Sequence, residues 1–84
     1  MDLERTERIL RSYRRLTIQE RRQVDSHLRL LAENPRHPGL RARKWPGSDI
    51  WYARVSRDIR LFYEVREDSY LLLDIGHHDI EGSR

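Results

Sequence analysis

Two prolines, Pro35 and Pro38, divide the 84-residue chain into parts with different hydrophobic periods. Before Pro35, apolar residues recur every three or four positions, which is typical of amphipathic helices. After Pro38, the segment IWYARVSRDIRLFYEVREDSYLLLDIG alternates and is rich in aromatic and β-branched residues, which is typical of strands. The order predicts an α+β fold, in which a helical hairpin packs on one face of a small, mainly antiparallel β-sheet.

The clearest helix is predicted at residues 17–34. Its start, TIQE, is a capping box, in which Thr17 and Glu20 each hydrogen-bond the other's backbone. Pro35 disfavours helix at Asn34 and cannot continue it, so the helix should end there. An earlier stripe predicts a first helix at about residues 5–15, marked by Ile9, Leu10, Tyr13 and Leu16.

Three strands are predicted, at about residues 50–56, 59–65 and 70–76. The connections SRDI and REDS are short and polar, so consecutive strands should form antiparallel hairpins. Residues 35–49 should be a loop, with or without a short strand near residues 40–43. With no repeat or linker, residues 1–84 are expected to form a single domain.

Strand alternation predicts which side chains share a face. The more apolar set should meet the helices: Trp51, Ala53, Val55, Ile59, Leu61, Tyr63, Val65, Leu71, Leu73 and Ile75. The opposite set should form an open face: Tyr52, Arg54, Arg60, Phe62, Leu72, Asp74 and, by extension, His78. His77 would then face the helices. Phe62 and Leu72 on an open face suggest a cover, such as a C-terminal segment, a partner or a nucleic-acid base.

Charge points toward a polyanionic partner without proving one. The net charge is +3, the pI is about 9.8, and Lys44 is the single lysine among 17 basic residues. Arginine suits phosphate binding, yet arginine in place of lysine also follows from GC-rich coding. Composition therefore leaves nucleic-acid binding open.

Several classes of protein are disfavoured. The chain has no cysteine, which excludes disulfides and thiolate chemistry and fits a reducing compartment. It has no apolar run of membrane-spanning length, and its first ten residues do not resemble a signal peptide. A cytoplasmic protein without a membrane partner is expected. His77 and His78 are adjacent in the predicted strand, so their side chains should point to opposite faces, which argues against both binding one metal ion. No metal site and no cofactor are predicted.

The segments LAENPRHPGLRARKWPG, WYARVSRDIRLFYEV and YLLLDIGHHD together resemble the RelE/ParE superfamily of bacterial toxins. The resemblance covers roughly residues 9–80. It implies a RelE-like fold, with a short N-terminal strand in DLERT, a helical hairpin and a curved antiparallel sheet. It also implies a cognate antitoxin protein as a partner.

Two activities occur in this superfamily, and the sequence leaves both open. RelE-like members are ribosome-dependent mRNA endoribonucleases that need no metal. ParE-like members inhibit DNA gyrase and are not nucleases. The ribosome and mRNA would be the partners in the first case, and DNA gyrase in the second. No tyrosine follows His78, which keeps a gyrase inhibitor or a catalytically degenerate binding member as the alternative.

By position, the resemblance assigns a RelE-type site to the open face. The implied catalytic residues are Arg54, Arg60 and His78. The implied RNA-binding residues are Arg41, Arg43 and Lys44 of the basic segment, with Tyr52 and Phe62 as candidates for stacking on a base. The chemistry would be attack of a ribose 2′-OH on the adjacent phosphorus, with arginines stabilising the charge and a histidine moving a proton.

Overall fold

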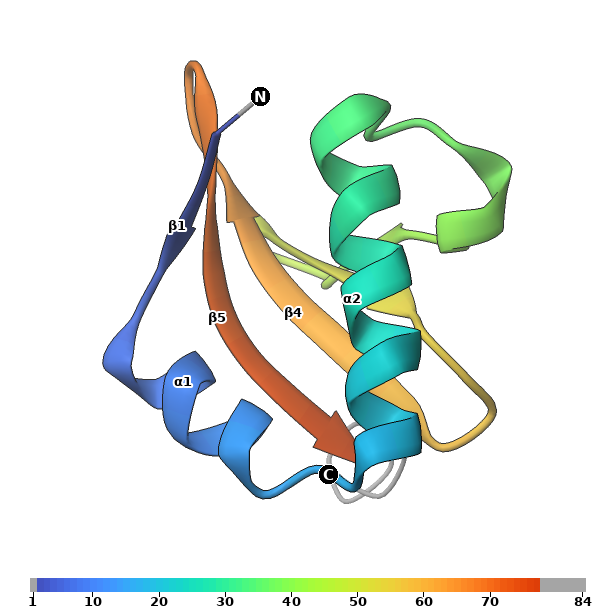
Figure 1. The fold of residues 1–84 in the computed structure, drawn as a ribbon. Helices are drawn as coiled ribbons and strands as arrows, with labels where there is room; N and C mark the ends of the chain where they lie inside the picture. Colours follow the sequence, from blue (N-terminus) through green and yellow to red (C-terminus); the bar gives the residue numbers. More distant parts are fainter. Residues whose placement is uncertain (1, 78–84) are drawn as a thin grey trace.

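The computed structural model describes residues 2–77, and these form one mixed sheet with two helices packed on it (Figure 1). The elements are β1 (Asp2–Arg5), α1 (Glu7–Arg14), α2 (Ile18–Glu33), a 3₁₀ helix η1 (Pro38–Leu40), β2 (Arg43–Lys44), β3 (Ile50–Arg54), β4 (Ile59–Val65) and β5 (Ser69–His77). The α+β fold predicted from the sequence, with a helical pair on one face of the sheet, is confirmed.

The strand order in the sheet is β1-β5-β4-β3-β2. The three long strands pair antiparallel, as the short connections predict, while β1 pairs parallel to β5. The first and last strands are therefore neighbours, and β1 forms the edge that the family resemblance implied for DLERT. The short strand in the loop is β2, a few residues later than expected.

The capping box predicted for α2 is present. The hydroxyl of Thr17 accepts from the backbone N–H of Glu20, and the Glu20 carboxylate accepts from the N–H of Thr17 at 2.9 Å. At the preceding turn, the Tyr13 hydroxyl donates to Asp25 and the Arg21 guanidinium donates to the carbonyls of Tyr13 and Arg14. These bonds fix the corner between α1 and α2.

The core lies between the helices and the sheet. Val24 and Leu31 of α2 and Leu40 of η1 are completely buried against the long strands. The sheet contributes Ala53, Val55, Ile59, Leu61, Tyr63, Tyr70, Leu72 and Ile75, and α1 with its following turn contributes Ile9 and Leu16. Among residues 2–77, no helix is long and apolar enough to cross a membrane.

The face assignment was wrong for the first half of β5. Phe62 pairs with Asp74 while Tyr63 pairs with Leu72, so Leu73 is an extra residue, a β-bulge. The bulge shifts the alternation by one position. Leu72 consequently lies in the core with no exposed surface, and Leu71, opposite Glu64, lies on the other face. Beyond the bulge the predicted parity returns, because Ile75 pairs with Leu61.

Candidate functional site

The open face of the sheet carries a basic hollow of about 390 Å³ at its β2–β3–β4 side. Its walls are Arg41, Ala42, Arg43, Tyr52, Arg54 and Arg60, which we call the arginine hollow. Four of these six residues are arginines, and none of the described lining residues is acidic. A concentration of guanidinium groups suits a phosphate group.

Strand register brings these residues together. Arg43 lies opposite Tyr52, and Arg54 lies opposite Arg60, so each pair shares a face of the sheet. Arg41 precedes β2 and has the left-handed conformation, φ 48°, at the end of η1. This turn carries the chain from the buried Leu40 to the sheet edge.

Two of the predicted RNA-binding residues, Lys44 and Phe62, do not line the hollow. Phe62 stacks on Tyr52 beside it, whereas Lys44 lies on the other face of the sheet. It pairs with Trp51, whereas Arg43 pairs with Tyr52, and successive strand residues point to opposite faces. Lys44 is therefore on the same side of the sheet as Trp51, away from Arg54 and Arg60. Its contribution to RNA binding stays a prediction, but a contact within the hollow would require rearrangement of β2.

Arg60 lies on the predicted face but is buried, with 5% of its surface exposed. Its Nη1 donates to the carbonyls of Ser56, Arg57 and Ile59, at 3.0, 3.2 and 3.4 Å. Gly76 is its neighbour on β5 and has no side chain to occupy that space. Arg60 is therefore on the predicted face without being exposed, because its guanidinium also satisfies the carbonyls of the turn between β3 and β4.

His77 ends β5 and pairs with Ile59, which puts it in the helix-side register as predicted. Its side chain is exposed, and Nε2 lies 3.7 Å from Oε2 of Glu20 at the start of α2. The expectation that His77 contacts a helix is met, although the contact is not buried. His78, the predicted proton-transfer residue, lies outside the described residues.

Three aromatic rings line the open face next to the arginine hollow. Tyr52 and Phe62 stack, with ring centroids 5.9 Å apart and an interplanar angle of 28°. Trp45 contacts both rings, at centroid distances of 5.8 and 6.1 Å. This aromatic cluster partly covers the face and explains why Phe62 can lie there. Sequence reasoning missed Trp45. The sequence signal that could have located it is the Trp-Pro-Gly-Ser turn, which places its ring over the open face of the sheet.

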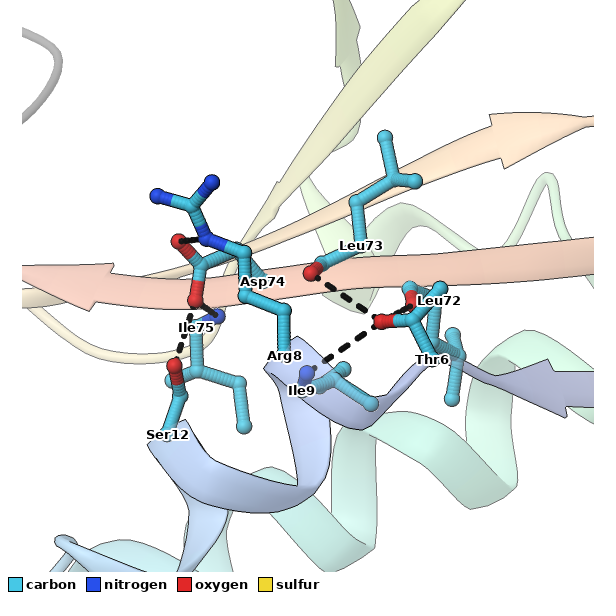
Figure 2. A network of polar contacts seen from close by, with 8 residues as sticks. All are labelled: Thr6, Arg8, Ile9, Ser12, Leu72, Leu73, Asp74 and Ile75. Carbon is cyan, nitrogen blue, oxygen red and sulfur yellow. Dashed lines mark hydrogen bonds and ion pairs between the residues drawn. The ribbon is translucent and has the colours of Figure 1, made fainter.

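The far side of the open face is closed by α1 (Figure 2). The Asp74 carboxylate accepts from Ser12 Oγ at 2.5 Å and from Arg8 Nε at 3.1 Å. The Thr6 hydroxyl donates to the carbonyl of Leu72, beside the bulge, and accepts from the N–H of Ile9. Asp74 is thus engaged with α1 and is not part of the arginine hollow.

Among residues 2–77, no three His, Asp or Glu side chains come together in a way that could hold a metal ion. The arginine side chains of the hollow are suited to binding a phosphate group.

A family model matches residues 3–81, almost the whole chain. It is described as the ParE toxin of the type II toxin–antitoxin system, parDE. This chain belongs to that toxin family. The resemblance to the RelE/ParE superfamily is thereby confirmed, and the chain is a type II toxin of that superfamily.

Solved toxin structures share the fold. The toxin is similar to the RelBE toxin–antitoxin complex of E. coli, with 26% identity, a TM-score of 0.73, and 89% of this chain and 93% of that chain covered. It is also similar to a YoeB/ParE toxin from Agrobacterium tumefaciens, with 16% identity, a TM-score of 0.80, and 93% and 99% covered. The RelE–RelB complex of Pyrococcus horikoshii OT3 shows 17% identity and a TM-score of 0.76, over 90% and 92%. No curated protein sequence matches.

Proposed function

We propose that this toxin is a metal-independent endoribonuclease that cleaves mRNA on the ribosome. The observation that carries the proposal is the arginine hollow, where Arg41, Arg43 and Arg54 surround a space of about 390 Å³ beside Tyr52. RNA offers both groups that such a site can hold, a phosphate for the guanidinium forks and a base for the aromatic rings. The similarity to the E. coli RelBE toxin supports the same class.

In the proposed reaction the ribose 2′ oxygen attacks the adjacent phosphorus as the bond to the 5′ oxygen breaks. A base removes the 2′ proton, and an acid protonates the departing 5′ oxygen. Arg54, Arg41 and Arg43 would bind the non-bridging oxygens, on which negative charge builds. Arg60 would contribute positive charge from the buried side of the hollow and would stabilise the turn between β3 and β4. His78 is our candidate for proton transfer, because a histidine exchanges protons near neutral pH.

Substitution of Arg54 tests the proposal, since its side chain is exposed and lies at the hollow. Arg54→Ala should lower ribosome-dependent mRNA cleavage about 100-fold or more while leaving the melting temperature unchanged. Cleavage is measured in a translation extract, with and without ribosomes. Arg29→Ala removes an equal charge from the exposed side of α2 and should leave cleavage intact. Full activity of Arg54→Ala would refute the assignment.

The second candidate is inhibition of DNA gyrase, favoured by the family model, which describes a ParE toxin. In that case the arginine hollow would contact protein or DNA and would cleave nothing. A supercoiling assay separates the two. A ribonuclease should leave gyrase-driven supercoiling unchanged, whereas a gyrase inhibitor should abolish it and leave mRNA intact.

We further propose that a cognate antitoxin protein neutralises the toxin, because similar solved structures include toxin–antitoxin complexes. We expect a small gene beside this one. Its product should suppress toxicity and co-purify with the toxin.

A further inference from the structure

A cleft of about 530 Å³ lies on the helix side of the sheet, opposite the face that carries the arginine hollow. Residues of β3, β4 and β5 form its floor, and the segment between α2 and β2 forms its rim. We call it the tyrosine cleft, and its main walls are Trp51, Tyr63, Val65, Tyr70, Arg36 and Arg41. Pockets of this size, with mostly apolar and aromatic walls and a few polar groups, are typical of sites for small molecules.

Two phenol groups in the cleft have no hydrogen-bond partner among residues 2–77. Tyr63 is 2% exposed and Tyr70 is 3% exposed, and their rings contact edge to face with centroids 5.7 Å apart. Burial raises the pKa of the Tyr63 phenol to about 12, so this hydroxyl is a proton donor at neutral pH. A buried hydroxyl without a partner has lost the hydrogen bonds that it makes in water. A ligand with an acceptor atom would restore them.

The rim of the cleft is positively charged. Arg36 and Arg41 are exposed, and no described wall residue is acidic. Arg36 lies close enough to Tyr70 for its charge to lower the pKa of that phenol, against the larger effect of burial. A carboxylate at this position would accept from the guanidinium and from the hydroxyl together.

The backbone of the rim is fixed by local hydrogen bonds. Oδ1 of Asn34 accepts from the N–H of Arg36 at 3.0 Å, and Nδ1 of His37 accepts from the N–H of Gly39 at 2.9 Å. Leu40, which ends η1, is completely buried in the core. The cleft is therefore formed before a ligand arrives, which reduces the entropy lost on binding.

The tyrosine cleft and the arginine hollow share two wall residues, Arg41 and Ala42. The two spaces open on opposite faces of the sheet, and the segment before β2 lies between them. The exposed Arg41 side chain is thus within reach of both. A guanidinium that binds a carboxylate in the cleft is withdrawn from a phosphate in the hollow.

We propose that the tyrosine cleft binds a small carboxylate with a flat apolar body, and that Arg41 couples its occupancy to the arginine hollow. The apolar body packs on Trp51 and Tyr63, while the carboxylate accepts from Tyr70 and from the rim arginines. Occupancy weakens RNA binding in the hollow, and RNA weakens binding of the carboxylate by the same factor. The effect on RNA rests on the proposed function, whereas the carboxylate site does not.

Binding is tested with 2-naphthoate as the probe. The chain has two tryptophans and therefore two indole N–H signals in an NMR spectrum, which Trp45→Phe assigns. The naphthoate should shift the Trp51 signal saturably and leave the Trp45 signal, from the open face, unchanged. 2-Naphthamide has the same body without the charge and should bind about 10-fold more weakly or worse.

Two variants locate the carboxylate. Tyr70→Phe removes only a hydroxyl that has no described partner, so it should leave the melting temperature unchanged and raise the dissociation constant of naphthoate about 2- to 10-fold. Arg36→Gln should raise that constant about 10-fold or more. Arg22→Gln, which removes an equal charge near the other end of α2, is the control and should bind like the parent.

Coupling is measured with a 2′-O-methyl RNA hexanucleotide, which cannot be cleaved at the 2′ oxygen. Saturating naphthoate should raise the dissociation constant of the hexamer about 5-fold or more, and acetate at the same concentration should not. In Arg41→Gln the naphthoate should no longer affect the hexamer.

Failure of the carboxylate site and failure of the proposed function give different results. If naphthoate leaves the Trp51 signal unchanged, or if the amide binds equally well, the carboxylate site is overturned. If naphthoate binds but the hexamer does not, the RNA site fails, the coupling fails with it, and the carboxylate site stands. If both bind without affecting each other, coupling through Arg41 is refuted. If only the antitoxin shifts the Trp51 signal, the cleft is a protein-binding site and the inference is wrong.

Discussion

Arg60 shows how one side chain can have both a structural and a chemical role. Its burial and its bonds to three backbone carbonyls make it part of the β3–β4 turn, while its charge faces the arginine hollow. Loss of activity on substitution would therefore be ambiguous by itself. Arg54 is free of this problem, because its side chain is exposed.

Arg60→Met should lower the free energy of unfolding by about 1–3 kcal/mol, because the partly buried carbonyls of Ser56 and Arg57 lose their donor. Urea denaturation of the purified toxin measures the change. Arg54→Met, one strand away on the same face, is the matched control and should alter stability by less than about 0.5 kcal/mol. Equal stability of the two variants would show that Arg60 has no structural role.

Tyr63 offers a test by alkaline titration. Burial raises the pKa of its phenol to about 12, with a smaller effect from Tyr70. The pKa of Tyr63 in the folded state is above the unfolded value of about 10. The contribution of the neutral Tyr63 phenol to folding stability is therefore complete below pH 10 and is lost as pH rises toward 12. Tyr63→Phe should abolish the late absorbance change near pH 12. A change that persists in this variant would contradict the assignment.

At the scale of elements, Thr6 links the start of α1 to the bulge in β5 (Figure 2). Its hydroxyl accepts from Ile9 N–H as an N-cap and donates to the carbonyl of Leu72 at 2.9 Å. Thr6→Val should cost about 1–2 kcal/mol of stability, since both bonds are lost. Thr6→Ser keeps the hydroxyl and should be close to the parent. Thermal denaturation of both variants measures the difference, and a loss in Thr6→Ser as large as that in Thr6→Val would contradict the assignment to the hydroxyl.

The capping box of α2 gives stability a defined dependence on acid. The Thr17 N–H bond to the Glu20 carboxylate lowers the pKa of Glu20, and His77 acts in the same direction to a smaller extent. Stability from this group is present above the ordinary pKa, about 4.5, and is lost as pH falls through the lower folded value. Glu20→Gln should flatten that part of the stability profile. An unchanged acid limb in the variant would show that other carboxylates dominate it.

Local signals in the sequence were sufficient for most elements. The capping box located α2, and alternation located β3, β4 and the second half of β5. Alternation failed at the bulge because residues 71–73 are all leucine, so their pattern contains no information on which one is extra. Trp45 was missed because it lies in a turn, where strand parity does not apply. The burial of Arg60 depends on the path of a turn, which periodicity does not describe.

At the scale of the whole molecule, β1 protects one edge of the sheet. It pairs in parallel with β5, Leu3 packs against the core, and Ser69 donates to the Glu4 carboxylate at 2.6 Å. Deleting residues 2–5 should lower stability and expose the edge of β5 to other chains. Urea denaturation and size-exclusion chromatography measure both effects. Glu4→Gln, which keeps the strand, is the control and should remain monodisperse if the parent is.

The parallel pairing of β1 with β5 also determines when the sheet can be completed during synthesis. The sheet cannot be completed until β5 (Ser69–His77) has left the ribosome, because β5 is the partner of β1 and is made long after it. Pairing across such a separation closes late in folding as well, because the whole intervening chain must be ordered. A nascent chain stalled before β5 would have no finished arginine hollow, since Gly76 beside Arg60 would be missing. The topology therefore delays completion of the sheet until β5 has been translated.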